Sequence, residues 1–108
     1  MNVLSIKEKL GLSAFVTGND RAEVLSCYSG DVLSAVMSHA KRGALWLTVL
    51  TDMSVAVTAK LTDVAAVLLC EGVKPDEHLL AKAKQQGVTL LGTDSAVFET
   101  AAALSKWL

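Results

Sequence analysis

The sequence has 108 residues, 52% of them hydrophobic, and 10 Lys and Arg against 11 Asp and Glu give a net charge of −1. These totals predict one domain over residues 1–108, and they argue against disorder and against nucleic acid as a partner. The apolar runs are too short for a membrane span, and the start lacks the pattern of a secretory signal, so we expect a cytoplasmic protein.

The first half of the chain alternates short apolar runs with segments of helical periodicity. Ser5 is the candidate N-cap of the first helix, and Gly11 is its predicted end. In chain order, the predicted elements are helix Ser5–Leu10, strand Ser13–Thr17, strand Val24–Cys27 and helix Asp31–Lys41.

The second half repeats this alternation with longer and more apolar strands. The run Ala44–Leu50 has no polar face, which is typical of strands buried on both sides of a parallel sheet. In chain order, the predicted elements are strand Ala44–Leu50, helix Met53–Leu61, strand Ala65–Cys70, a helix from Pro75 to Gly87, strand Val88–Leu91 and helix Ser95–Trp107.

This order of elements predicts an α/β fold in a single three-layer domain. The sheet is expected to be mostly parallel, with about four to five strands and helices on both faces. Right-handed crossovers would then place every strand-to-helix loop on the same edge.

A short pattern that occurs twice in the sequence points to that edge. The segments "TDMSVAVTA" and "TDSAVFETA" each follow a buried strand and open a helix, so Thr51-Asp52 and Thr93-Asp94 are predicted to lie on the same edge of the sheet. Asp31, Asp52 and Asp94 each stand where a helix N-cap belongs, and capping is the structural interpretation. Because ligands of open α/β sheets bind beyond the carboxyl ends of the strands, a binding role is the functional interpretation.

The candidate ligand-binding residues are polar or small side chains near this edge. Lys74 is the one cation predicted near the pocket, and Tyr28 could stack on or hydrogen-bond a ligand. The full set is Cys27, Tyr28, Ser29, Asp31, Thr51, Asp52, Glu71, Lys74, Thr93 and Asp94.

The cysteines and histidines give weaker signals. Cys27, just before a predicted helix, is a candidate nucleophile or redox thiol, but neither His39 nor His78 is spaced to act as its base. Cys70, at the end of an apolar run, is predicted to be a core residue. No zinc spacing, P-loop or dinucleotide-binding motif is present, so no metal site is expected and any cofactor is unknown.

Several stretches resemble the DRTGG-domain family. They are Tyr28–Ser34, the strand "LWLTVLT" and the segment "LTDVAAVLLCEGVKPDEHLLAKAKQQGVTLLGTD", within which "EGVKPDE" is the most specific piece. The resemblance covers nearly the whole chain from about Leu25 onward. The letters that name the family are absent, since Asp20-Arg21 is not followed by Thr-Gly-Gly.

The resemblance implies a fold similar to the N-terminal domain of HPr kinase/phosphorylase. Similar domains are regulatory modules beside phosphotransacetylase or CBS domains, and similar small proteins are often encoded near iron-only hydrogenase subunits. Stand-alone members often carry the name serine kinase, which does not fit a chain without a P-loop. The resemblance supplies no catalytic residues.

We therefore expect a non-catalytic regulatory or accessory module that forms a homodimer. It is expected to bind a small ligand, with a nucleotide-like molecule as one option, or a partner protein. A link to hydrogenase or redox metabolism follows only from the resemblance. Two alternatives stay open at this point: a thiol-dependent enzyme or sensor that uses Cys27, and a structural subunit that docks through apolar helix faces.

Overall fold

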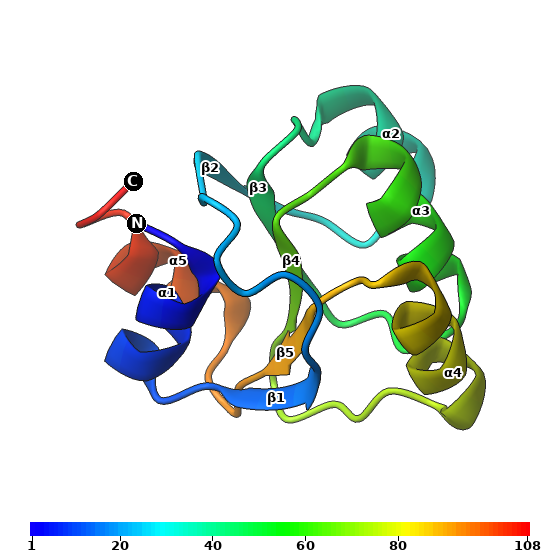
Figure 1. The fold of residues 1–108 in the computed structure, drawn as a ribbon. Coiled ribbons are helices and arrows are strands. Elements are labelled where there is room, and N and C mark those ends of the chain that lie inside the picture. Colours follow the sequence, from blue (N-terminus) through cyan, green and yellow to red (C-terminus); the bar gives the residue numbers. More distant parts are fainter.

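The computed structural model describes all residues 1–108 and contains one five-stranded sheet between two layers of helices (Figure 1). In chain order, the elements are α1 (Val3–Leu10), β1 (Ser13–Val16), β2 (Ser26–Ser29), α2 (Leu33–His39), β3 (Ala44–Thr48), α3 (Ser54–Thr62), β4 (Ala66–Leu69), α4 (Glu77–Gln86), β5 (Leu90–Gly92) and α5 (Val97–Leu104). This confirms the predicted α/β class and the helices on both faces.

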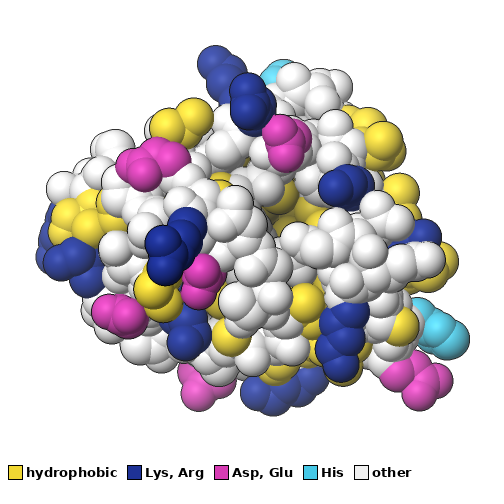
Figure 2. All heavy atoms as spheres, viewed as in Figure 1, with side chains coloured by type: hydrophobic (Ala, Val, Ile, Leu, Met, Phe, Trp, Pro, Cys, Tyr) yellow, Lys and Arg dark blue, Asp and Glu magenta, His cyan; other side chains and the backbone are white.

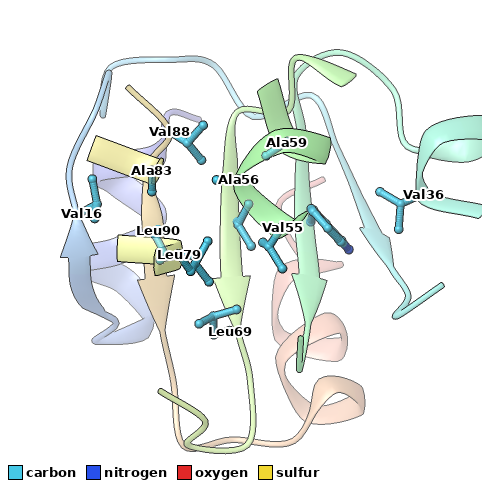
Figure 3. Close-up of a cluster of buried hydrophobic side chains, with 12 residues drawn as sticks. Val16, Val36, Val55, Ala56, Ala59, Leu69, Leu79, Ala83, Val88 and Leu90 are labelled. Atoms are coloured by element: carbon cyan, nitrogen blue, oxygen red, sulfur yellow. The ribbon is translucent and has the colours of Figure 1, made fainter. Parts of the chain in front are cut away.

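The sheet is mixed, with strand order β1-β5-β4-β3-β2. Strands β2, β3, β4 and β5 run parallel, while β1 pairs antiparallel with β5 (Figure 3). The register shifts between Ala14 and Val16, so Phe15 is the extra residue of a bulge in β1. Their shared direction brings the carboxyl ends of four strands to one edge of the sheet.

Two hydrophobic clusters fill the spaces between the sheet and the helices. Successive residues of a strand point to opposite faces, so Leu45 and Leu47 join the cluster with α1 and α5, while Trp46 joins the cluster with α2, α3 and α4. Every residue of β3, β4 and β5 is buried, as the apolar runs predicted.

Helix ends follow local chemistry in most places. Gly11 and Gly87 adopt left-handed conformations and end α1 and α4, as predicted. The predicted cap at Ser5 is wrong: α1 begins earlier, and the Asn2 side chain accepts a hydrogen bond from the Ser5 backbone N–H. Asp76 caps α4 by accepting from the Leu79 N–H.

Trp46 connects the core to the edge of the sheet. Its ring is fully buried, and its indole Nε1 donates a hydrogen bond of 2.9 Å to the Gly30 carbonyl just beyond β2. The largest core side chain thus holds the turn that leads from β2 to α2.

We predict that Trp46→Phe lowers the free energy of unfolding by about 2 kcal/mol, because it leaves a cavity and an unpaired carbonyl. Trp107→Phe is the matched control, since Trp107 lies at the exposed end of the chain, and its effect should stay within about 0.5 kcal/mol. Urea denaturation followed by circular dichroism measures both. Equal losses in the two variants would contradict the role given to Trp46.

Candidate functional site

Four loops meet at the carboxyl edge of the parallel strands, and eight of the ten candidate residues lie on them or at a strand end. The eight are Ser29, Asp31, Thr51, Asp52, Glu71, Lys74, Thr93 and Asp94. The loops after β3 and β4 are joined, because the Asp76 backbone N–H donates to the Thr51 carbonyl at 3.0 Å.

One part of this edge is hollowed into a cavity of about 410 Å³, here called the edge cleft. Lys74, Thr93 and Asp94 are the candidate residues that line it. Its full lining comes from β1, the end of β5 and the loops around them: Gly11, Ser13, Phe15, Gly72, Val73, Lys74, Gly92, Thr93, Asp94 and Ser95. Ser29, Asp31, Thr51, Asp52 and Glu71 share the edge but do not line the cleft.

Sequence reasoning missed the wall of the cleft that β1 supplies. Ser13 lies opposite Gly92 in the antiparallel pair, and its hydroxyl donates to the Gly92 carbonyl at 3.2 Å. The bulge at Phe15 is beside the cleft, where bulges commonly redirect a side chain. No local pattern announces this pairing, because it joins residues at opposite ends of the chain.

Backbone hydrogen bonds tie the other two walls together. The Glu71 N–H donates to the Ser95 carbonyl and the Gly72 N–H to the Thr93 carbonyl, both at 2.9 Å. Glu71 and Gly72 have φ angles of 62° and 71°, so the loop after β4 turns through two consecutive left-handed residues. The walls of the edge cleft are therefore fixed before any ligand binds.

Two glycines make room for the side chains of the cleft. A Cβ atom on Gly92 would lie 2.5 Å from Cε2 of Phe15, so only glycine lets the ring pack there. A Cβ atom on Gly72 would lie 3.1 Å from Oδ1 of Asp94. The Lys74 ammonium lies 5.6 Å from the centroid of the Phe15 ring, within the range of a cation–π contact.

The other part of the edge is closed by internal hydrogen bonds. Oδ1 of Asp31 accepts from the buried Thr48 hydroxyl at 2.7 Å and from the Val49 N–H at 3.0 Å. Asp31 therefore joins the ends of β2 and β3, and its predicted role as the cap of α2 is wrong, because α2 begins without a side-chain cap.

The two remaining aspartates of the capping prediction behave differently. Asp52 accepts from the backbone N–H and the hydroxyl of Ser54, but it stands one residue before the N-cap Met53, so the predicted cap is wrong by one position. Asp94 makes no such bond: the N-cap of α5 is Ala96, and this helix has no side-chain cap. Its carboxylate is instead beside Gly72 in the edge cleft.

Cys27 and Tyr28 lie away from the edge cleft. Cys27 is in β2, where it pairs with Leu45 of β3, and it lines a separate groove of about 380 Å³ beside α5. The Tyr28 ring packs on the other face of the sheet, 6.4 Å from the His39 ring. Burial, with a smaller effect of Cys70, raises the pKa of the Cys27 thiol to about 11, which works against a thiolate nucleophile.

A second large cleft, of about 550 Å³, lies at the amino edge of the sheet near Arg42 and Asp63. Arg42 and Asp63 in this cleft form an ion pair with each other, since Nε of Arg42 is 3.1 Å from Oδ2 of Asp63. Figure 2 shows that charges of both signs are interspersed over the visible face of the molecule. The edge cleft differs because neither Lys74 nor Asp94 takes part in an ion pair.

No group of three or more His, Cys, Asp or Glu side chains is arranged to hold a metal ion. None of the helices combines the length and the apolar character needed to cross a bilayer.

Comparisons with known proteins were made for both sequence and fold. The family model of the DRTGG domain matches residues 5–107. A similar solved structure is that of the CBS and DRTGG domains of the regulatory region of Clostridium perfringens pyrophosphatase, complexed with its activator diadenosine tetraphosphate. The TM-score is 0.72 at 12% identity, over 94% of this chain and 44% of that one, so the likeness shows the fold. A search of the curated proteins found no match.

We predict that Asp31→Ala costs about 1–2 kcal/mol of unfolding free energy, because it leaves the buried Thr48 hydroxyl without its acceptor. Asp52→Ala is the matched control and should cost less, about 0.5–1 kcal/mol, since its bonds to Ser54 are exposed. Urea denaturation compares the two. A larger loss for Asp52→Ala would contradict the stabilising role given to Asp31 between the ends of β2 and β3.

We also predict that Cys27 reacts slowly with iodoacetamide at neutral pH. A pKa raised from 9.0 to about 11 lowers the thiolate fraction about a hundredfold below that of an ordinary thiol. Peptide mass spectrometry after timed alkylation, with the urea-unfolded protein as control, gives the rate at Cys27. An alkylation rate in the folded protein that equals or exceeds the rate in the unfolded protein would support the hypothesis of an enzyme that uses the Cys27 thiol.

Proposed function

The chain belongs to the DRTGG-domain family, and on that premise we propose that it is a non-catalytic regulatory or accessory module that binds a small ligand in the edge cleft. The resemblance seen in the sequence is thereby confirmed at the level of the family. The proposal assigns the chain a binding role and no reaction.

The observation that carries this proposal is the edge cleft itself. A cavity of about 410 Å³ lies within the range of small-molecule sites, and it is at the carboxyl edge where open α/β sheets hold ligands. Lys74 and Asp94 line the cavity, and neither side chain has an ion-pair partner in the protein. Backbone hydrogen bonds fix the surrounding loops.

The similar solved structure supports a regulatory role in a limited way. That protein is the regulatory region of a pyrophosphatase and was crystallised with a nucleotide activator, which agrees with the expectation of a nucleotide-like ligand. This chain spans less than half of its length, so the activator is carried over here only as a proposal. The homodimer, the cytoplasmic location and the hydrogenase link stay predictions.

Docking to a partner protein is a second candidate function. An exposed apolar stripe runs along α3, with one side chain every four residues from its N-cap onward. Its members are Met53, Val57 and Leu61, which are 47%, 39% and 68% exposed. Exposed apolar stripes at helical spacing are typical of surfaces that meet another protein. The thiol enzyme has less support, because burial disfavours the Cys27 thiolate.

Thermal unfolding in the presence of a metabolite panel tests the binding role. At a concentration about tenfold above its Kd, a ligand should stabilise the protein by about 1.4 kcal/mol, which raises Tm by roughly 5 °C or more. Ser95→Trp fills the cleft from an exposed position and should abolish this shift. Ser34→Trp, exposed on α2 at the other end of the sheet, should keep it.

The panel should include nucleotides, sugars, organic acids and amino acids. A shift that persists in Ser95→Trp would place the ligand elsewhere and defeat the proposed site. If no member of the panel shifts Tm, the binding function loses its support and partner docking becomes the better explanation.

A further inference from the structure

The edge cleft holds one positive and one negative side chain, and neither is neutralised by the protein. Lys74 and Asp94 both line the cavity, yet they take no part in the ion pairs of the protein, which join Met1 to Glu23, Arg42 to Asp63, and His78 to Glu77. Lys74 and Asp94 are therefore also more than ion-pair distance from each other. Opposite charges that share a cavity without pairing leave room for a ligand between them.

Each of these two charged side chains has its own contact in the cleft. The Lys74 ammonium is held near the face of the Phe15 ring, which the bulge in β1 brings to the cleft. The Asp94 carboxylate packs closely against Gly72, where a Cβ atom would lie 3.1 Å from its Oδ1. Since the loops are tied by backbone hydrogen bonds, little ordering remains to oppose binding.

The rest of the lining favours a polar ligand of low net charge. Only Phe15 and Val73 are hydrophobic among the ten lining residues, and Ser13, Thr93 and Ser95 supply hydroxyls. The two charges of the cleft cancel. Asp31, Asp52 and Glu71 add further negative charge along the same edge, so a polyphosphate would meet repulsion that a single lysine cannot offset.

We propose that the edge cleft binds a small zwitterion of the amino acid class, with its carboxylate at Lys74 and its ammonium at Asp94. This assignment rests on the proposed binding function and narrows it to one kind of ligand. The charge pattern favours both groups on one molecule, because a simple anion would engage only Lys74 and a simple cation would engage only Asp94, whereas a zwitterion engages both. The volume of about 410 Å³ suits a small metabolite.

NMR titration of the isotope-labelled protein tests the proposal. The probes are the free proteinogenic L-amino acids, their N-acetyl and methyl-ester derivatives, and adenosine monophosphate. At least one free amino acid should shift the backbone resonances of Gly72, Gly92 and Asp94. Its N-acetyl and ester forms, which each lack one charge, should bind about tenfold more weakly or worse.

Charge-removing variants show which side chain holds which group. Lys74→Met should weaken the free amino acid about tenfold and should no longer distinguish it from its ester. Asp94→Asn should lose the distinction between the free and N-acetylated forms. Lys84→Met on α4 and Asp63→Asn at the end of α3 are the matched controls, and both should bind as the unchanged protein does.

Three outcomes would overturn the zwitterion. Adenosine monophosphate could shift the cleft resonances while every amino acid fails, which would leave the proposed small-ligand function intact. Binding that ignores both blocking groups would show that the two charges do not select the ligand. If no probe moves the cleft resonances, the amino acid class is excluded, and the metabolite panel decides the binding function separately.

Discussion

Burial of β3, β4 and β5 on both faces is the constraint on which the rest of the structure depends. A strand without a polar face needs a helix layer on each side, and parallel neighbours need a crossover between them. Alternation along β3 sends Leu45 and Leu47 to one layer and Trp46 to the other. The loops that follow these strands must then meet at one edge, so packing in the core decides where polar loop residues gather.

That shared edge has two parts, which differ in whether the protein itself provides hydrogen-bond or ion-pair partners for the polar side chains. Near β2, Asp31 binds the Thr48 hydroxyl and the Val49 N–H, and Trp46 binds the Gly30 carbonyl, so this part is closed by the protein itself. Near β5 the loops are tied mainly through their backbones, and Lys74 and Asp94 take no part in an ion pair. The same architecture therefore yields a structural clasp at one end and an open cleft at the other.

Much of the fold could be predicted from the sequence, because two-sided apolar runs, helical stripes and terminal glycines are local signals. The loops after β3, β4 and β5, with Lys74, Thr93 and Asp94, follow from that pattern. The wall from β1 does not, since Ser13 bonds Gly92 across 79 residues of sequence and the bulge at Phe15 arises only in that pairing. The cap predicted at Asp31 is wrong for the same reason: capping is a local contact, while the partner of Asp31, Thr48, is on the neighbouring strand.

The edge strand β1 connects the cleft to the rest of the molecule. It pairs on one side only, with β5, and it directly follows α1, which lies beside α5 and near both termini (Figure 1). A ligand held between Lys74 and Asp94 would contact β1 and the loops after β4 and β5 together, and so add to the few hydrogen bonds that hold this strand. Since a ligand shifts an equilibrium only through contacts that differ between states, β1 is the element through which occupancy of the cleft would reach the α1–α5 face.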